Sequence, residues 1–119
     1  YPEIIVPKAL DIGPKIQDMF GRAYKAGVKI AFGTDAAVFY HGDNAKEFGY
    51  MVEAGMPAIE ALQSATITNA MLLSMEDQIG QLKPNYIADI IAVNDDPISS
   101  ISTMENVIFV MKNGVIYKK

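Results

Sequence analysis

Length, composition and charge place this chain among ordinary folded domains. Its 119 residues are half hydrophobic, which is enough to bury a core and argues against disorder. Ten basic against fourteen acidic side chains give a net charge of −4, which offers no attraction to a nucleic-acid backbone. The chain has no cysteine for a disulfide or a thiolate metal site, and its apolar runs are shorter than the roughly 20 residues that cross a bilayer. We therefore expect neither a nucleic-acid nor a membrane partner.

The first element that the sequence predicts is an amphipathic helix that begins at Pro14. Apolar residues recur there at helical spacing, and Gly27 follows the expected end. These apolar residues are Ile16, Met19, Phe20, Ala23 and Tyr24. A short β-rich run over residues 28–32, closed by Gly33, then predicts a strand buried in a parallel sheet. A helix followed by a buried strand is typical of an α/β fold.

Three further helices are expected after a loop over residues 34–43. Asn44 is expected to cap the first of them, with Glu47 at its third position. Pro57 is expected to open the second helix, and a third, short helix is predicted over residues 69–74. The first part of the chain is therefore expected to be mainly helical.

The last part of the sequence changes to short strands and turns. Residues 88–93 predict one strand, and two β-rich runs over residues 107–112 and 115–118 predict two more. The last two runs flank Asn113-Gly114, a strong signal for a tight hairpin turn. We therefore predict an antiparallel hairpin at the end of the chain.

One acidic side chain stands where a chemical role is expected. Asp35 follows the predicted strand directly after Gly33-Thr34. Barrels of alternating strands and helices place their reacting groups at the carboxyl ends of the strands. Taken alone, however, an aspartate after a strand is more often a turn former or a helix cap. Its interpretation depends on the sequence around it.

Residues 26–36, with the sequence AGVKIAFGTDA, resemble the eighth strand of the amidohydrolase superfamily. The resemblance continues in the order of the family along nearly the whole chain. The later matching segments are residues 53–56, 60–62, 65–66, 69–70, 80–84, 88–90, 96–98 and 110–114. Within the superfamily the chain is most similar to the Xaa-Pro dipeptidase, carboxypeptidase and imidazolonepropionase-like branch, partly through residues 41–44 and Glu47.

The resemblance implies the fold class. We expect an α/β structure, formed by the carboxy-terminal segment of a (β/α)8 metal-dependent hydrolase barrel and by strands of a small β-sandwich domain. Residues 1–75 would hold the last strand and helices of the barrel, and residues 76–119 the part of the β-sandwich domain. We therefore expect a carboxy-terminal fragment, with the missing barrel portion as its partner. Bare strand edges and uncovered helix faces further predict a homo-oligomer.

The resemblance also implies a metal site. Family members hold one or two divalent metals, commonly zinc, through a His-x-His pair, further histidines, often a carboxylated lysine, and the aspartate of strand eight. Asp35 matches that aspartate, so it is implied to be both metal ligand and catalytic proton shuttle. The other ligands have no counterparts, because His41 is the only histidine. We therefore expect zinc or another divalent metal in the intact protein, but no tight binding by this chain alone.

Two residues of the loop after Asp35 are candidate substrate-binding residues. His41 and Tyr40 would face the mouth of the site, and Phe39 is a further candidate to line it. The alternative for His41 is an ordinary loop histidine held by local hydrogen bonds, and that for the two aromatic residues is a place in the core. Glu47 is interpreted as a capping partner of Asn44.

These observations favour an enzyme that acts on a small-molecule substrate. We expect the intact protein to use metal-activated water to hydrolyse an amide-type C–N bond, in a dipeptide or an N-acyl amino acid. Two alternatives stay open. One is an imidazolonepropionase-like amidohydrolase that opens a cyclic amide or deaminates a ring, and the other is a non-catalytic interaction module. The sequence does not determine the cellular compartment, although a cytoplasmic location is slightly favoured.

Overall fold

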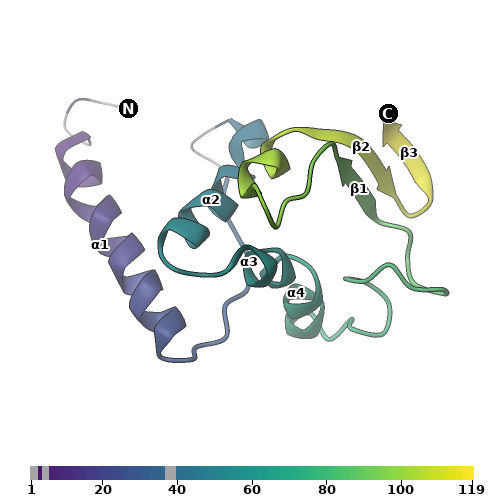
Figure 1. Cartoon of the computed structure of the whole chain (residues 1–119), viewed down its shortest axis with the longest axis horizontal. Helices are drawn as coiled ribbons and strands as arrows, with labels where there is room; N and C mark the ends of the chain where they lie inside the picture. The colour runs from purple at the N-terminus through teal and green to yellow at the C-terminus, as the bar shows by residue number, and fades with distance from the viewer. Residues whose placement is uncertain (1–2, 4–5, 37–39) are drawn as a thin grey trace.

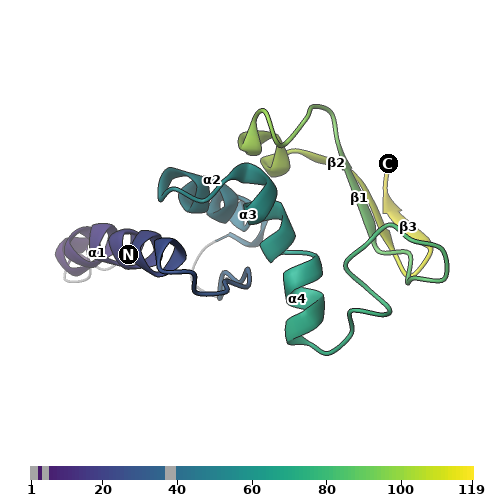
Figure 2. The ribbon, with the colours of Figure 1, turned by 60° about the horizontal axis from the view of Figure 1, so that its bottom comes forward.

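The computed structural model describes residues 3, 6–36 and 40–119. The long helix α1 (Val6–Lys25) lies at one end of the longest axis, and a three-stranded sheet lies at the other (Figure 1). Three short helices, α2 (Lys46–Glu53), α3 (Ala58–Ser64) and α4 (Ile67–Leu72), occupy the middle in both ribbon views (Figure 2). The described chain is therefore mixed α and β, as predicted.

Helix α1 begins well before Pro14, so the prediction that this proline opens the helix is wrong. The proline lies inside the helix, where its ring removes one intrahelical hydrogen bond. An exposed ion pair of 2.8 Å between Lys15 and Asp11 spans this turn. Such a pair, four residues apart, contributes a few tenths of a kcal/mol, roughly 0.2–0.5. The apolar periodicity predicts the helix after Pro14 correctly, but it does not indicate the helical turns before that proline.

Helix α1 packs on the end of α2 through one close approach. Gly21 is buried, and a Cβ added to it would lie 2.8 Å from the backbone oxygen of Ala54. Only a glycine leaves room for the two backbones at this distance. A bulkier residue at position 21 would therefore push the helices apart.

Within the described part of the chain, residues 28–32 form no strand, so the prediction of a strand there is wrong. A strand is defined by hydrogen bonds to a neighbouring strand, and the described part of the chain supplies none beside this segment. The segment is instead held by the short helices, because the N–H of Phe32 donates to the carbonyl oxygen of Ser64 over 3.1 Å.

The predicted cap of α2 by Asn44 is also wrong. The residue that precedes the helix is Ala45, and within the described residues no side chain caps it. Asn44 follows a short 3-10 helix, η1 (His41–Asp43), with φ −53° and ψ −38°. This is a helical conformation, whereas a capping residue needs an extended one. Glu47 therefore has no capping partner in Asn44.

The next two helices agree with the sequence in kind but differ at their ends. Pro57 precedes α3, as predicted, with φ −58° and ψ 144°. Helix α4 covers Ile67–Leu72, so the predicted range of 69–74 lies too far along the chain. Ser74 has φ 55°, which is incompatible with a continuing right-handed helix. The helix consequently ends before it.

The sheet consists of β1 (Ile90–Val93), β2 (Val107–Lys112) and β3 (Val115–Lys118), in that order and antiparallel. The predicted hairpin between β2 and β3 is confirmed. Asn113 and Gly114 have φ values of 48° and 79°, the positive values that a tight two-residue turn of type I′ requires. The turn is held by Asp89, whose carboxylate accepts the N–H of Asn113 over 2.8 Å.

The hydrophobic core joins the helices to the segment that precedes β2. Met104, on the 3-10 helix η2 (Ile101–Glu105), is buried in a cluster whose other buried members come from α2, α3 and the turn between them. These other members are Phe48, Met51, Met56 and Ala61. The predicted division of the chain at residue 76 stays a prediction.

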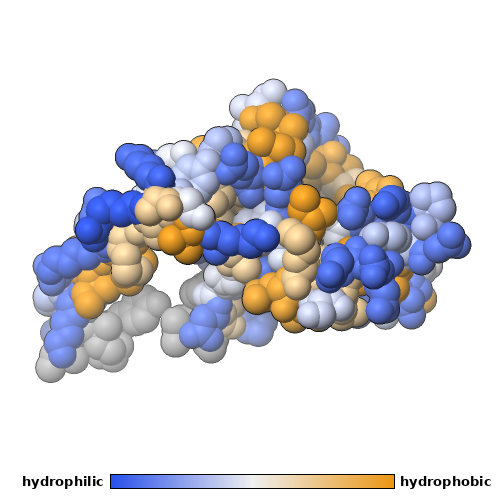
Figure 3. Space-filling view, turned by 90° about the horizontal axis from the view of Figure 1, so that it is seen from below, coloured by the Kyte–Doolittle hydropathy of each residue, from blue (hydrophilic) through white to orange (hydrophobic). Residues whose placement is uncertain are grey.

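Much of the apolar surface of α1 is exposed. Leu10, for example, lies on this helix and has 72% of its surface exposed. Seen from below, hydrophobic and hydrophilic side chains lie next to one another over the end of the molecule that α1 forms (Figure 3). In the parts of the chain that the structure describes, no helix combines the length and apolar character needed to cross a membrane.

Candidate functional site

The segment that leads into Asp35 is anchored at Phe32. The N–H of Phe32 donates to Ser64, and its carbonyl oxygen accepts a hydrogen bond of 3.0 Å from Nδ2 of Asn69. Its ring stacks on that of Phe48, with centroids 4.4 Å apart and planes inclined by 28°. Backbone and side chain of this residue are therefore both fixed to the helical part of the fold.

Asp35 itself is exposed and has a backbone φ of 47°. This left-handed conformation costs most residues about 1–2 kcal/mol, whereas aspartate and asparagine tolerate it better. The same conformation occurs at Ser74, Asn85 and Asn113, so by itself it marks a turn. The structure thus presents the Asp35 carboxylate at the surface, three residues after the anchored Phe32.

The two candidate substrate-binding residues lie on the loop after Asp35. Tyr40 is 86% exposed, and its carbonyl oxygen accepts the N–H of Asp43 over 2.9 Å. His41 opens η1 and is exposed as well. Neither residue lies in the core, and their role in substrate binding stays a prediction. Phe39, the further candidate, lies outside the described residues.

The donor set of this chain fits one ligand of a divalent metal. The Asp35 carboxylate is a ligand type that zinc accepts, but a catalytic zinc normally has about three protein ligands. Within residues 3, 6–36 and 40–119, no three histidine, cysteine, aspartate or glutamate side chains lie together in a group able to hold a metal ion. The described residues therefore do not make a complete centre by themselves.

We expect the 119-residue chain on its own to retain no stoichiometric zinc and to hydrolyse no dipeptide, because one carboxylate cannot replace a full ligand set. The test is metal analysis after dialysis of the purified chain against zinc-free buffer, together with a dipeptide assay. The whole protein, treated in the same way, is the control. Stoichiometric zinc with dipeptide turnover in the isolated chain would contradict this expectation.

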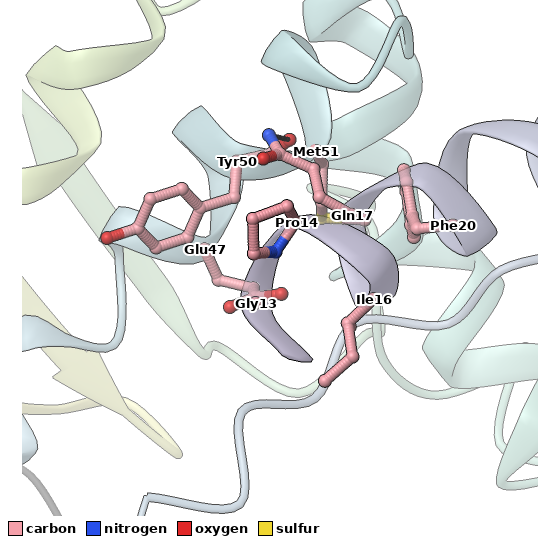
Figure 4. A pocket seen from close by; sticks show the side chains of 8 residues that line it. All are labelled: Gly13, Pro14, Ile16, Gln17, Phe20, Glu47, Tyr50 and Met51. Carbon is pink, nitrogen blue, oxygen red and sulfur yellow. Dashed lines mark hydrogen bonds between the residues drawn. The ribbon is translucent and has the colours of Figure 1, made fainter. Parts of the chain in front are cut away.

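A cavity of about 490 Å³ between α1 and α2 was not foreseen from the sequence. Figure 4 shows that its lining side chains come from these two helices, with Pro14, Ile16 and Phe20 on α1. Glu47 lines it from α2, and burial raises the pKa of the Glu47 carboxyl above its ordinary value. The half-buried Glu47 thus faces a largely apolar cavity.

Comparison with known proteins places the chain in a family. The model of the Amidohydrolase family matches residues 5–117. Ochratoxinase of Aspergillus niger is 37% identical over an alignment of 101 residues, and the match covers 81% of this chain and 21% of ochratoxinase. A 5-methylthioadenosine/S-adenosylhomocysteine deaminase of Teredinibacter turnerae is 37% identical over an alignment of 78 residues, and the match covers 57% of this chain and 18% of the deaminase.

A solved structure agrees with the family match. The crystal structure of a Xaa-Pro dipeptidase with bound methionine in the active site has a TM-score of 0.91 and 55% sequence identity, and the match covers 100% of this chain and 29% of that one. The chain thus spans less than a third of the length of these relatives. The family model covers nearly every residue, so this chain belongs to the amidohydrolase family.

Proposed function

We propose that the whole protein containing this chain is a metal-dependent hydrolase that cleaves the C–N bond of a dipeptide of the Xaa-Pro type. The observation that carries the proposal is the 55% identity to a Xaa-Pro dipeptidase over 100% of the chain. Similarity to ochratoxinase over 81% of the chain supports the same family of hydrolases. The chain spans 29% of that dipeptidase, so in this proposal it is one part of such an enzyme.

In this proposal Asp35 carries the proton. Its exposed carboxylate follows the anchored Phe32, so its position is defined while its oxygens stay accessible. A carboxylate so placed accepts a proton from the attacking water and returns it to the leaving amine. A divalent metal, with zinc as our candidate, would polarise the amide carbonyl and ease the deprotonation of water, with Asp35 as one of its ligands.

The loop after Asp35 is our candidate for substrate recognition. A dipeptide carries a free carboxylate, which can accept a hydrogen bond from an imidazole N–H. In this proposal the exposed His41 supplies the imidazole, and the exposed Tyr40 before it in the chain offers an aromatic ring. We propose that His41 holds the carboxylate and that Tyr40 lies against the apolar part of the substrate.

A second candidate function is the deamination of a ring. It is favoured by one observation, the 37% identity over 78 residues to a deaminase. The same carboxylate chemistry suits both reactions, because each of them transfers a proton from water to a leaving nitrogen. The two candidates differ in the product, since one releases two amino acids and the other releases ammonia.

Product analysis of the whole protein tests the proposal. With zinc present, we expect turnover of Xaa-Pro dipeptides to two amino acids, and no turnover of the reversed Pro-Xaa dipeptides, which place the ring at the other end. An adenosine-type ring amine and an N-acyl amino acid complete the panel. Release of ammonia from the ring amine, with no cleavage of any dipeptide, would replace the proposal by the second candidate.

A further inference from the structure

A side chain far along the sequence holds the peptide plane that leads into Asp35. The Nδ2 of Asn69, on α4, donates to the carbonyl oxygen of Phe32 over 3.0 Å, across a separation of 37 residues. This carbonyl belongs to the planar peptide group that links Phe32 to Gly33. The hydrogen bond therefore fixes the orientation from which the chain continues through Gly33 and Thr34 to Asp35.

The two residues that hold Phe32 are themselves at least half-buried in the short helices. Asn69 is half-buried on α4, and Ser64, which accepts the N–H of Phe32, is buried at the end of α3. The Ser64 hydroxyl donates to the carbonyl oxygen of Ala61 over 2.6 Å, within the same helix. The two partners of Phe32 therefore sit on neighbouring short helices, which fix both its N–H and its C=O.

The hydrogen bond from Asn69 matters for Asp35 because a glycine follows Phe32. Glycine has no side chain to restrict its backbone, so it rotates more freely than any other residue. Gly33 separates the anchored Phe32 from Thr34 and Asp35, and a Cβ added to it would meet no atom within 4 Å. Between this peptide plane and Asp35, the described residues make no further hydrogen bond to another element, so the plane that Asn69 holds is the last fixed point before the carboxylate.

We propose that Asn69 is a positioning residue for Asp35. Its amide sets the peptide plane before Gly33 and thereby the place of the carboxylate, without touching the reacting atoms. The inference rests on the proposed function, in which Asp35 transfers the proton. A displacement of about 1 Å at a reacting group costs up to roughly 10²-fold in rate. Loss of the Asn69 amide should therefore affect turnover more than substrate binding.

The test uses two variants of Asn69 in the whole protein. Asn69→Ala removes the amide, and Asn69→Asp keeps the shape but offers no N–H when ionised. We expect both to lower kcat by about 10- to 100-fold with a smaller change in KM. We also expect faster hydrogen exchange at the amide of Phe32 in both, because the second anchor of this residue is lost.

The control variant is Thr66→Ala, at the joint between the same two helices. Its hydroxyl donates to the carbonyl oxygen of Leu62 over 2.9 Å, so this hydrogen bond does not involve the segment before Asp35. Thr66→Ala should leave both kcat and the exchange at Phe32 unchanged. If the Asn69 variants match this control in either measurement, the positioning role is overturned.

A third variant separates this inference from the proposed function. If Asp35→Asn abolishes turnover while the Asn69 variants keep it, only the positioning role fails. If Asp35→Asn keeps full turnover, the proton transfer by Asp35 fails and the positioning role fails with it. Loss of turnover in both the Asp35 and the Asn69 variants, with faster exchange at Phe32 in the latter, supports the two together.

Discussion

Asp35→Asn in the whole protein is expected to lower kcat by about 10²–10⁴-fold, the usual contribution of general acid–base catalysis. Asparagine has the shape of aspartate and can still offer an oxygen to a metal, but it cannot accept the proton from water. Because asparagine also tolerates the φ of 47° at this position, the substitution adds no backbone strain. The effect is therefore expected on the chemical step rather than on the fold.

Steady-state kinetics with metal analysis in parallel measures this effect. Asp95→Asn is the matched control, because Asp95 is an exposed aspartate in the turn before Pro97, and the same change there should leave kcat unaltered. The melting temperature of both variants should stay close to that of the unchanged protein. A metal-loaded Asp35→Asn enzyme with nearly normal kcat would rule out proton transfer by Asp35.

Phe48→Ala is expected to lower the free energy of unfolding by about 3–5 kcal/mol, the usual cost of removing a buried aromatic ring. Phe48 is only 7% exposed and belongs to the central cluster. Its ring also stacks on that of Phe32, which carries the two anchoring hydrogen bonds. The substitution therefore opens a cavity and removes one support of the segment before Asp35.

Urea unfolding of the protein measures this loss. Tyr117→Ala is a suitable control, because it removes a ring of similar size from β3, where the side chain is 70% exposed. An exposed position of this kind usually changes stability by roughly 0.5 kcal/mol or less. An equal loss in the two variants would show that Phe48 does not contribute to the core as the structure indicates.

The parts of the fold that depend on neighbouring residues could be predicted from the sequence. The turn at Asn113-Gly114 is such a part, because these two residue types adopt positive φ values more readily than others. Pro57 before α3 is another, since its ring fixes the backbone at the start of a helix. In both places the local chemistry is sufficient, and tertiary contacts agree with it.

The parts that depend on distant residues could not be predicted in this way. A strand over residues 28–32 needs a neighbouring strand, and the described residues give Phe32 helical partners instead. Pro14 gave the opposite error, because the rule that proline opens a helix concealed the turns before it. Asn44 has the right residue type for a cap, but its backbone is already helical.

The candidate site shows the same division. Asp35 was found from its sequence context, because its neighbours along the chain form a recognisable segment. Its anchor was not found, since Asn69 lies 37 residues beyond Phe32 and no spacing rule connects them. The only signal was the short segment Asn69-Ala70, which matches the family but does not say which backbone atom the amide holds.

The burial of Met104 against α2 and α3 has a consequence for biosynthesis. The chain is synthesised from its amino terminus, so both helices leave the ribosome well before residue 104 does. Until then Phe48 and Met51 lack one of the side chains that cover them. The entropy cost of closing the long intervening segment grows only slowly with its length, so docking can follow once η2 emerges. A nascent chain that stalls before residue 101 therefore exposes apolar side chains of α2 that chaperones can bind.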